Sequence, residues 1–267
     1  MAHPRPAWIL ALAFALLSAV FLVVHQSDRR LVAALADRLD AGRQLTSAQR
    51  LALYTGFAHS ELGSPRYEDL HPWPVRLYYR LNPLHPGPGD VLRWGPDYRG
   101  TCGSRANVTI ALLQERGVPA RHLFLLDERG RSIHDVVEAR IDGSWVVADA
   151  NYGIVYRRPD GSLATAADLA SKPALFHAHV DTIAAYDRRY TYESVAHMNW
   201  GKIPVLLPVF RGMLERVLGR DRVGEIQRPG IWMWPWAFYS VIWAVLAVFA
   251  AAVALRGSSR AKVRPPA

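Results

Sequence analysis

The only cysteine of the chain, Cys102, stands in the stretch GTCGSRANVTIALLQERGVP, residues 100–119. The spacing of apolar residues predicts a helix from Gly103 to Arg116, which the following glycine and proline end. Cys102 therefore falls at the first turn, where unpaired backbone N–H groups and the positive end of the helix dipole favour an anion. A thiolate held there is a nucleophile. The thiol alone leaves a second interpretation open, a small buried apolar residue.

A histidine and an aspartate follow on two β-rich runs that meet at the dipeptide Asp142-Gly143. This dipeptide is a strong signal for a two-residue hairpin turn. With such a turn, His134 and Asp149 are diagonal neighbours on one face of the hairpin, within reach of a hydrogen bond. A shift of one residue in register would place them on opposite faces.

These three residue types together are the pattern of covalent acyl transfer. Such chemistry needs a thiolate nucleophile, an imidazole that moves protons and a carboxylate that orients the imidazole. The alternative is a histidine on the surface and an exposed aspartate at a strand end. We expect the first arrangement, with Cys102, His134 and Asp149 in one crevice.

Two segments carry a resemblance to a known family, GTCGSRANVTIALLQERGVPAR and HDVVEARIDGSWVVADANYG. Over about residues 90–160 they resemble the core of the transglutaminase-like superfamily. The resemblance implies an α+β, papain-like fold in which the cysteine helix packs against an antiparallel sheet. It also implies that Cys102 is the nucleophile, that His134 is the general base and acid, and that Asp149 orients His134. The chain departs from the family at Val136, often an aromatic residue, and at Ala150, often proline.

Three further residues are candidates for supporting the site. Trp94 is a candidate oxyanion donor through its indole N–H, beside the backbone N–H of Cys102. Asn151 and Tyr152 are candidates for supporting Asp149 or His134 from behind, although packing or turn formation explains each of them more simply. We expect no cofactor.

One other group of residues could bind a metal ion. His177, His179 and Asp181 have a spacing that would bring two imidazoles to one side of a strand. Because no further ligand cluster accompanies them, we expect solvated or hydrogen-bonded histidines and no metal site.

The remaining elements frame this site. Two helices are expected between residues 29 and 62, the second capped by Thr46 or Ser47. From residue 64 to 99 the chain is rich in proline and aromatic residues, which predicts extended and turn structure without a long helix. The predicted core then runs from the cysteine helix into three strands.

An apolar, uncharged stretch lies near each end of the chain. Residues 7–24 and 231–255 each have the length that crosses a hydrocarbon core of about 30 Å. We interpret both as transmembrane helices, the first as a retained anchor rather than a cleaved signal sequence. Residues 256–267 are basic without an acidic residue, which favours a cytoplasmic tail. Both termini would then be cytoplasmic, and the domain at residues 28–230 would be periplasmic, on an inner-membrane protein. Residues 201–219, apolar with basic interruptions, either lie on the bilayer surface or complete the core.

Composition limits the partners and the function. The net charge of +9 is carried mostly by scattered arginines, which argues against a nucleic-acid partner, because phosphate binding needs clustered charge. We expect an enzyme that takes a peptide, amide or polymer-linked acyl substrate in the cell envelope, by hydrolysis or transfer. The alternative is a catalytically silent scaffold of the same fold that binds a membrane-protein partner, for example in polysaccharide synthesis or export.

Overall fold

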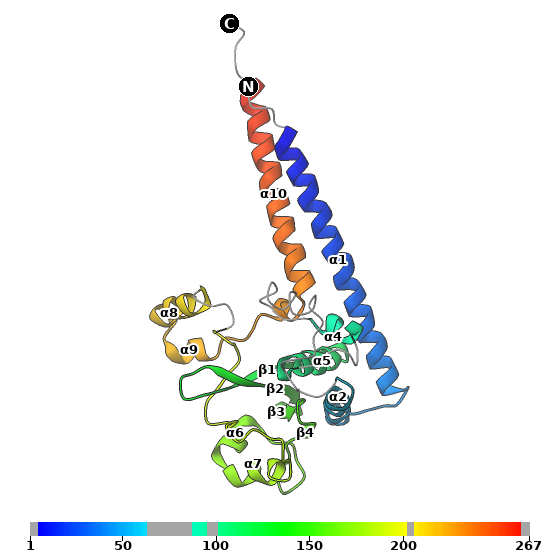
Figure 1. Cartoon of the computed structure of the whole chain (residues 1–267), viewed down its shortest axis with the longest axis vertical. Helices are drawn as coiled ribbons and strands as arrows, with labels where there is room; N and C mark the ends of the chain where they lie inside the picture. The colour runs from blue at the N-terminus through cyan, green and yellow to red at the C-terminus, as the bar shows by residue number, and fades with distance from the viewer. Residues whose placement is uncertain (1–4, 63–86, 95–100, 202–205, 263–267) are drawn as a thin grey trace.

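The computed structural model describes residues 5–62, 87–94, 101–201 and 206–262. Two long helices, α1 (Arg5–Asp40) and α10 (Pro235–Lys262), run side by side and project from a mixed α+β domain (Figure 1). The beginning of α1 and the end of α10 lie together, far from the domain. The two apolar ends predicted from the sequence therefore form one structural unit, which we call the helix pair.

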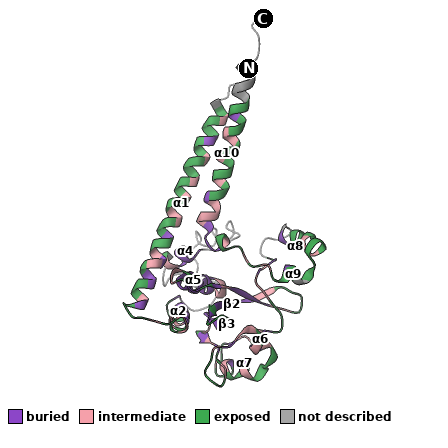
Figure 2. Cartoon of the chain, turned by 180° about the vertical axis from the view of Figure 1, so that it is seen from behind, coloured by how far each residue is buried: buried purple, intermediate pink, exposed green. Residues whose placement is uncertain are grey.

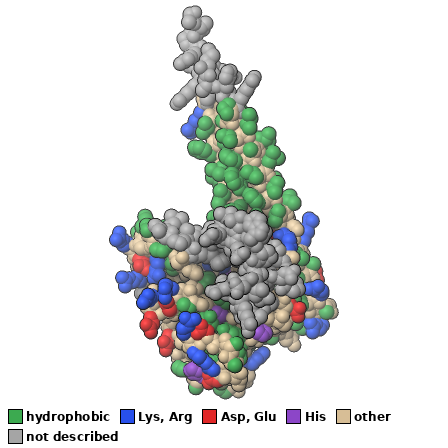
Figure 3. All heavy atoms as spheres, in the orientation of Figure 1, with side chains coloured by type: hydrophobic (Ala, Val, Ile, Leu, Met, Phe, Trp, Pro, Cys, Tyr) green, Lys and Arg blue, Asp and Glu red, His purple; other side chains and the backbone are tan. Residues whose placement is uncertain are grey.

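The helix pair has the properties of membrane-spanning segments. Pro6–Asp40 and Pro235–Arg256 are long and apolar enough to cross a membrane, and only 6% and 17% of their most apolar windows are buried. The helices are mostly exposed, whereas burial is concentrated at the centre of the domain (Figure 2). Apolar side chains cover the visible face of the helix pair, and charged side chains gather over the domain (Figure 3). This pattern is typical of a protein anchored by two membrane helices.

Polar and aromatic contacts hold the helix pair together. The hydroxyl of Ser18 donates to the carbonyl of Ser240 over 2.9 Å, and the hydroxyl of Ser240 donates back to the carbonyl of Ser18 over 3.0 Å. Small hydroxyl residues allow helices to approach closely in an apolar medium. Nearer the domain, the ring of Phe21 stacks on that of Trp236, with centroids 5.5 Å apart.

The helix expected to begin near residue 29 is the continuation of α1. Val32, Leu35 and Ala36 of α1 are buried in the main core of the domain. No break separates the span from this packed part, because no proline or glycine interrupts residues 7–40. The second expected helix is α2 (Ser47–Glu61), which begins with a capping box formed by Thr46 and Gln49.

A five-stranded antiparallel sheet forms the centre of the domain, in the order β4-β3-β2-β1-β5. Its strands are β1 (Ala120–Leu126), β2 (Ser132–Ile141), β3 (Ser144–Asp149), β4 (Ile154–Val155) and β5 (Val195–Ala196). Asp142 and Gly143 join β2 to β3 with φ angles of 50° and 81°, as a tight hairpin turn requires. The predicted register is confirmed, because Val137 pairs with Ala148. The short edge strands β4 and β5 were not predicted.

Helices cover both faces of this sheet. On one face lies α5 (Cys102–Glu115), whose Ala106, Ile110 and Leu113 share the main core with residues of β2 and β3. On the other face, α6 (Ala166–Ser171) and α7 (Pro173–Val180) close a second core rich in tyrosine. The predicted packing of the cysteine helix on an antiparallel sheet is therefore confirmed.

A short helix, α4 (Pro88–Trp94), connects the domain to the helix pair. The indole N–H of Trp236 donates to Asp90 over 2.9 Å, and Arg93 pairs with Asp28 of α1. Asp28 also lies against the backbone of Gly89 and leaves no space for a side chain there. Of the proline-rich segment predicted over residues 64–99, only α4 and Gly87 belong to the described residues.

The last part of the domain is a helical unit of α8 (Leu206–Leu218), α9 (Arg220–Gly224) and the 3-10 helix η2 (Gly230–Met233). Leu207 and Val223 pack with Met198 and Trp200 in a small core of their own. The outer face of α8 is apolar and exposed. In both ribbon views α8 lies to one side of the domain, level with the base of α10 (Figures 1 and 2).

Candidate functional site

The beginning of α5 positions the thiol. Thr101 caps the helix, and its hydroxyl accepts from the backbone N–H of Ser104 over 3.2 Å. The N–H groups of Cys102 and Gly103 have no acceptor within the helix, because the first turn has none to offer. Cys102 is half-buried and lines a cavity of about 310 Å³ together with His134. The thiol is therefore accessible and faces a pocket that also contains an imidazole.

The hairpin brings the predicted imidazole and carboxylate together. Nε2 of His134 lies 2.8 Å from Oδ2 of Asp149, and both side chains are fully buried. The other carboxylate oxygen, Oδ1, accepts from the backbone N–H groups of Asn151, over 2.9 Å, and Tyr152, over 3.3 Å. Asp149 is thus held rigidly by the turn that follows β3. Asn151 and Tyr152 support it through their backbone.

The charge of Asp149 acts strongly on His134. Burial alone lowers the pKa of the imidazole, but the charge and hydrogen bond of Asp149, with a contribution from Cys102, outweigh burial and raise the pKa to about 10. Because Nε2 binds Asp149, Nδ1 is the nitrogen that remains for the thiol. Nδ1 is buried, and a hydrogen bond with the thiol of Cys102 contributes to the raised pKa. The ring is therefore protonated at neutral pH, with Nδ1 on the side of Cys102.

Two tyrosines enclose the imidazole. The ring of Tyr190 stacks on that of His134, with centroids 4.2 Å apart and planes 4° from parallel. The ring of Tyr152 lies 5.9 Å from it on a tilted plane. Tyr190 also lines the cavity of Cys102. Sequence reasoning missed Tyr190, which stands in an irregular segment, and the only signal was the group of tyrosines at 186, 190 and 192.

A buried cation behind the site was also missed. Arg105, one turn after Cys102, is only 1% exposed, and its Nη1 donates to both oxygens of Asn151, the backbone one over 2.7 Å and Oδ1 over 3.0 Å. Burial lowers the pKa of Arg105, while the charges of Asp149 and Cys102 raise it. The guanidinium thus fixes the turn that holds Asp149 and offsets nearby negative charge.

Val136 and Ala150 are the two departures from the family pattern, and Trp94 is the predicted oxyanion donor. Val136 and Ala150 are fully buried, and Val136 belongs to the second core. Trp94 is the last residue of α4, and its side chain lies outside the described part of the chain. Its predicted role as a donor remains a prediction.

The histidines considered for a metal lie on a helix rather than on a strand. His177 and His179 belong to α7, where residues two apart point in different directions. Nδ1 of His177 lies 3.4 Å from Asp181, whereas Nδ1 of His179 lies 2.9 Å from the carbonyl of Leu175. The strand that would have brought two imidazoles to one side is absent here, because Pro173 begins a helix. Over the described residues, no group of three or more His, Cys, Asp or Glu could hold a metal ion.

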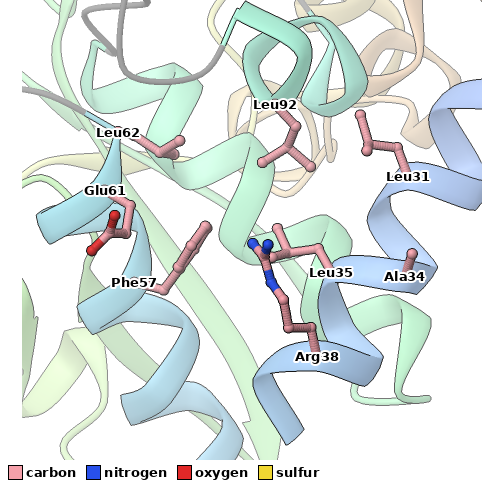
Figure 4. A pocket seen from close by; sticks show the side chains of 8 residues that line it. All are labelled: Leu31, Ala34, Leu35, Arg38, Phe57, Glu61, Leu62 and Leu92. Carbon is pink, nitrogen blue, oxygen red and sulfur yellow. The ribbon is translucent and has the colours of Figure 1, made fainter. Parts of the chain in front are cut away.

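A second cavity lies at the base of the helix pair, away from the thiol. It has a volume of about 470 Å³ and lies between α1, α2 and α4 (Figure 4). Arg38 and Phe57 point into the space between α1 and α2, and Leu92 closes it from α4. Apart from Arg38 and Glu61 its described lining is apolar, so it offers no nucleophile.

Comparison with known proteins identifies one family. The family model for the transglutaminase-like superfamily matches residues 66–150. The matched segment contains Cys102, His134 and Asp149, and it ends directly after β3. No curated protein and no solved structure matches the chain. The resemblance predicted from two short segments is therefore confirmed.

Proposed function

Because this chain contains a transglutaminase-like superfamily domain, we propose that it is a membrane-anchored cysteine enzyme of acyl transfer. Members of this superfamily share a papain-like fold and are often cysteine enzymes. The observation that carries the proposal is the buried His134–Asp149 pair, whose imidazole lines the same cavity as the only thiol of the chain.

The first half-reaction forms a thioacyl enzyme. The thiolate of Cys102 attacks the acyl carbon, and the S–C bond forms as the carbonyl oxygen becomes an oxyanion. The N–H groups at the beginning of α5, which have no acceptor within the helix, stabilise this charge. The bond to the leaving amine then breaks, and the protonated Nδ1 of His134 donates its proton to the nitrogen.

The second half-reaction releases the acyl group. His134, now neutral, takes a proton from water or from an amine as that acceptor attacks the thioester carbon. The S–C bond breaks and the thiolate returns beside the imidazolium. Water as acceptor makes the protein an amide hydrolase or peptidase, and an amine makes it a transferase. We propose a peptide, amide or polymer-linked acyl group of the cell envelope as substrate.

The proposed topology places this chemistry outside the cytoplasm. The beginning of α1 and the end of α10 both lie at the side remote from the domain. The basic residues after Leu255 favour the cytoplasm for that side. The packing of α1 into the domain core supports a retained anchor rather than a cleaved leader. The domain is then periplasmic on a two-pass inner-membrane protein.

The exposed face of α8 fits the bilayer surface in this arrangement. Val209, Phe210, Met213 and Val217 are all exposed on it. Because α8 lies level with the base of α10, these side chains would reach the interface without unfolding the domain. A polarity-sensitive fluorophore on Met213→Cys in a Cys102→Ser background should report an apolar environment in nanodiscs, unlike the same fluorophore on Arg211→Cys, which lies on the opposite side of the helix. Equal emission would contradict this placement.

Alkylation of the single thiol tests the enzymatic proposal. In full-length protein in detergent micelles at pH 7, we expect iodoacetamide to modify Cys102 at least tenfold faster than it modifies a small free thiol, since the imidazolium of His134 stabilises the thiolate. The variant His134→Ala should lose this advantage. The matched control is His177→Ala, because that imidazole is exposed on α7.

The alternative function gives a different result. A catalytically silent scaffold has no need of an activated thiol, so Cys102 would react no faster than a free thiol and with no dependence on His134. That outcome would contradict the proposed enzyme.

A further inference from the structure

A second buried polar group lies in the same cavity as Cys102 and takes no part in the proposed reaction. It consists of Asp135 on β2, His122 on β1, Asn107 on α5, and Arg228 in the segment between α9 and η2. Asp135, Asn107 and Arg228 line the cavity beside Cys102 and His134. We refer to these four residues as the arginine cluster.

The hydrogen bonds of the arginine cluster fix its protonation. Nη1 of Arg228 lies 3.1 Å from Nε2 of His122, and a guanidinium can only donate, so Nε2 accepts. The proton of His122 is therefore on Nδ1, which donates to Asp135 over 2.9 Å to Oδ1 and 3.1 Å to Oδ2. The cluster thus has a carboxylate at one end and a guanidinium at the other.

The carboxylate end lies next to the nucleophile. A Cβ atom at Gly103, the residue after Cys102, would lie 3.1 Å from Oδ2 of Asp135. Asp135 is only 6% exposed, and both its oxygens face the N–H of His122. This carboxylate is thus already engaged within the protein and is poorly placed to take a cationic ligand.

The guanidinium end is held in place, and Arg228 lines the cavity. Arg228 is half-buried, its Nη2 donates to the carbonyl of Trp232 over 3.0 Å, and its backbone N–H donates to the carbonyl of His197 over 2.9 Å. With His122 and with Asn107 at 3.5 Å, described acceptors account for three of its five N–H donors. Of the other two, Nε is buried, so a ligand in the cavity is left with one N–H of Nη2. Since these contacts already restrict the side chain, binding a ligand costs little further rotamer entropy.

We propose that Arg228 is a substrate-recognition residue that binds a carboxylate on the acyl substrate, while the scissile carbonyl lies at Cys102. The remaining N–H of Nη2 would donate a charge-assisted hydrogen bond to the carboxylate, which supplies both charge and direction. This inference rests on the proposed function, because it assumes that the cavity receives the substrate. It narrows the substrate class to acyl compounds that carry a negative charge close to the bond that is cleaved.

A pair of alkylating reagents tests this inference without knowledge of the substrate. Iodoacetate carries a carboxylate and iodoacetamide is its neutral analogue, and Cys102 is the only thiol that either can modify. The ratio of their rates, iodoacetate over iodoacetamide, cancels any change in the reactivity of the thiol itself. We expect Arg228→Gln to lower this ratio about tenfold, the scale of one charge a few ångströms away in a partly buried site.

Further variants keep the test valid if Arg228→Gln folds poorly. Arg228→Lys keeps the charge and should retain most of the ratio, whereas Asp135→Asn removes a repelling charge and should raise it. The matched control is Arg211→Gln on α8, where an exposed arginine pairs with Glu215; its ratio should stay within twofold of the unmodified protein. A ratio unchanged in both Arg228→Gln and Asp135→Asn would overturn the inference.

Protection of Cys102 identifies the source of the carboxylate. Acetyl-glycyl-glycine is compared with its C-terminal amide as a peptide ligand, and glucuronate with glucuronamide as a sugar ligand. Stronger protection by one acid than by its amide supports the inference and assigns a peptide or a sugar-acid substrate. If neither acid protects better than its amide, the carboxylate subsite is overturned. This result can be distinguished from failure of the proposed function, in which the reaction of iodoacetamide with Cys102 would not depend on His134.

Discussion

At the scale of single residues, the strongest coupling in the site is between His134 and Asp149. The pKa of His134 is raised to about 10 from an ordinary value of 6.5. Between these two values the folded protein keeps a proton that the unfolded chain releases. The contribution of this pair to stability is therefore complete below pH 6.5 and is lost as the pH rises through 10.

The variant Asp149→Asn removes this coupling. We expect it to lower the free energy of unfolding by on the order of a few kcal/mol near pH 6, and by clearly less near pH 10.5. Thermal unfolding of both proteins in micelles at the two pH values measures the difference. In parallel, the ¹³C resonance of the His134 ring should titrate near pH 10 in the unmodified protein and well below that in the variant. A loss of stability that is equal at both pH values would show that the imidazole is not held charged.

Tyr190 is a positioning residue, because its ring lies on the imidazole and not on the thiol. A parallel stack of this kind contributes about 0.5–1.5 kcal/mol. We expect Tyr190→Leu to slow the release of p-nitrophenol from p-nitrophenyl acetate by about tenfold or less. Tyr190→Phe keeps the ring and should retain the rate of the unmodified protein. Loss of rate in both variants would mean that the hydroxyl rather than the stack is required.

The three reactive residue types could be predicted from the sequence, since local rules position each of them. A helix beginning placed Cys102, and the turn at Asp142-Gly143 fixed the register of His134 and Asp149. Tyr190 and Arg228 could not be predicted, because they reach the cavity from irregular segments whose path depends on the packing of the whole domain. Periodicity carries no information about such segments.

At the scale of elements, the β2–β3 hairpin determines whether the site forms. Gly143 has a φ of 81°, a region that costs a residue with a side chain about 1 kcal/mol or more. We expect Gly143→Ala to destabilise the protein by about that amount. Gly56 in α2 is the matched control, because a Cβ there meets no atom within 4 Å, and Ala in a helix should stabilise by about 1 kcal/mol. Two shifts of the same sign in thermal unfolding would contradict the turn assignment.

Short elements set the limit of prediction at this scale. The cysteine helix and the three long strands have clear periodicity, and the sequence predicted each of them. The strands β4 and β5 have two residues each, too few to show a pattern. The run FHAHVD has the alternation of a strand, yet Pro173 and the capped helix before it make α7 a helix. Here a local backbone preference overrides the alternation.

For the whole molecule, the proposed topology places both ends of the chain on one side of the membrane and the domain on the other. In a Cys102→Ser background, a membrane-impermeant maleimide should label Ser162→Cys, in an exposed turn of the domain, in intact cells with a permeable outer layer. It should label Ser259→Cys in the basic tail only after the membrane is broken. The reverse pattern would place the domain in the cytoplasm and contradict the proposed topology.

In the proposed reaction Cys102 carries an acyl group, which mass spectrometry of the intact protein detects. After exposure to p-nitrophenyl acetate and quenching in acid, we predict one acetyl group that neutral hydroxylamine removes, as it removes a thioester. The group should be absent from Cys102→Ser and strongly reduced in His134→Ala. An equal hydroxylamine-sensitive adduct on Cys102→Ser, or none on the unmodified protein, would contradict the account.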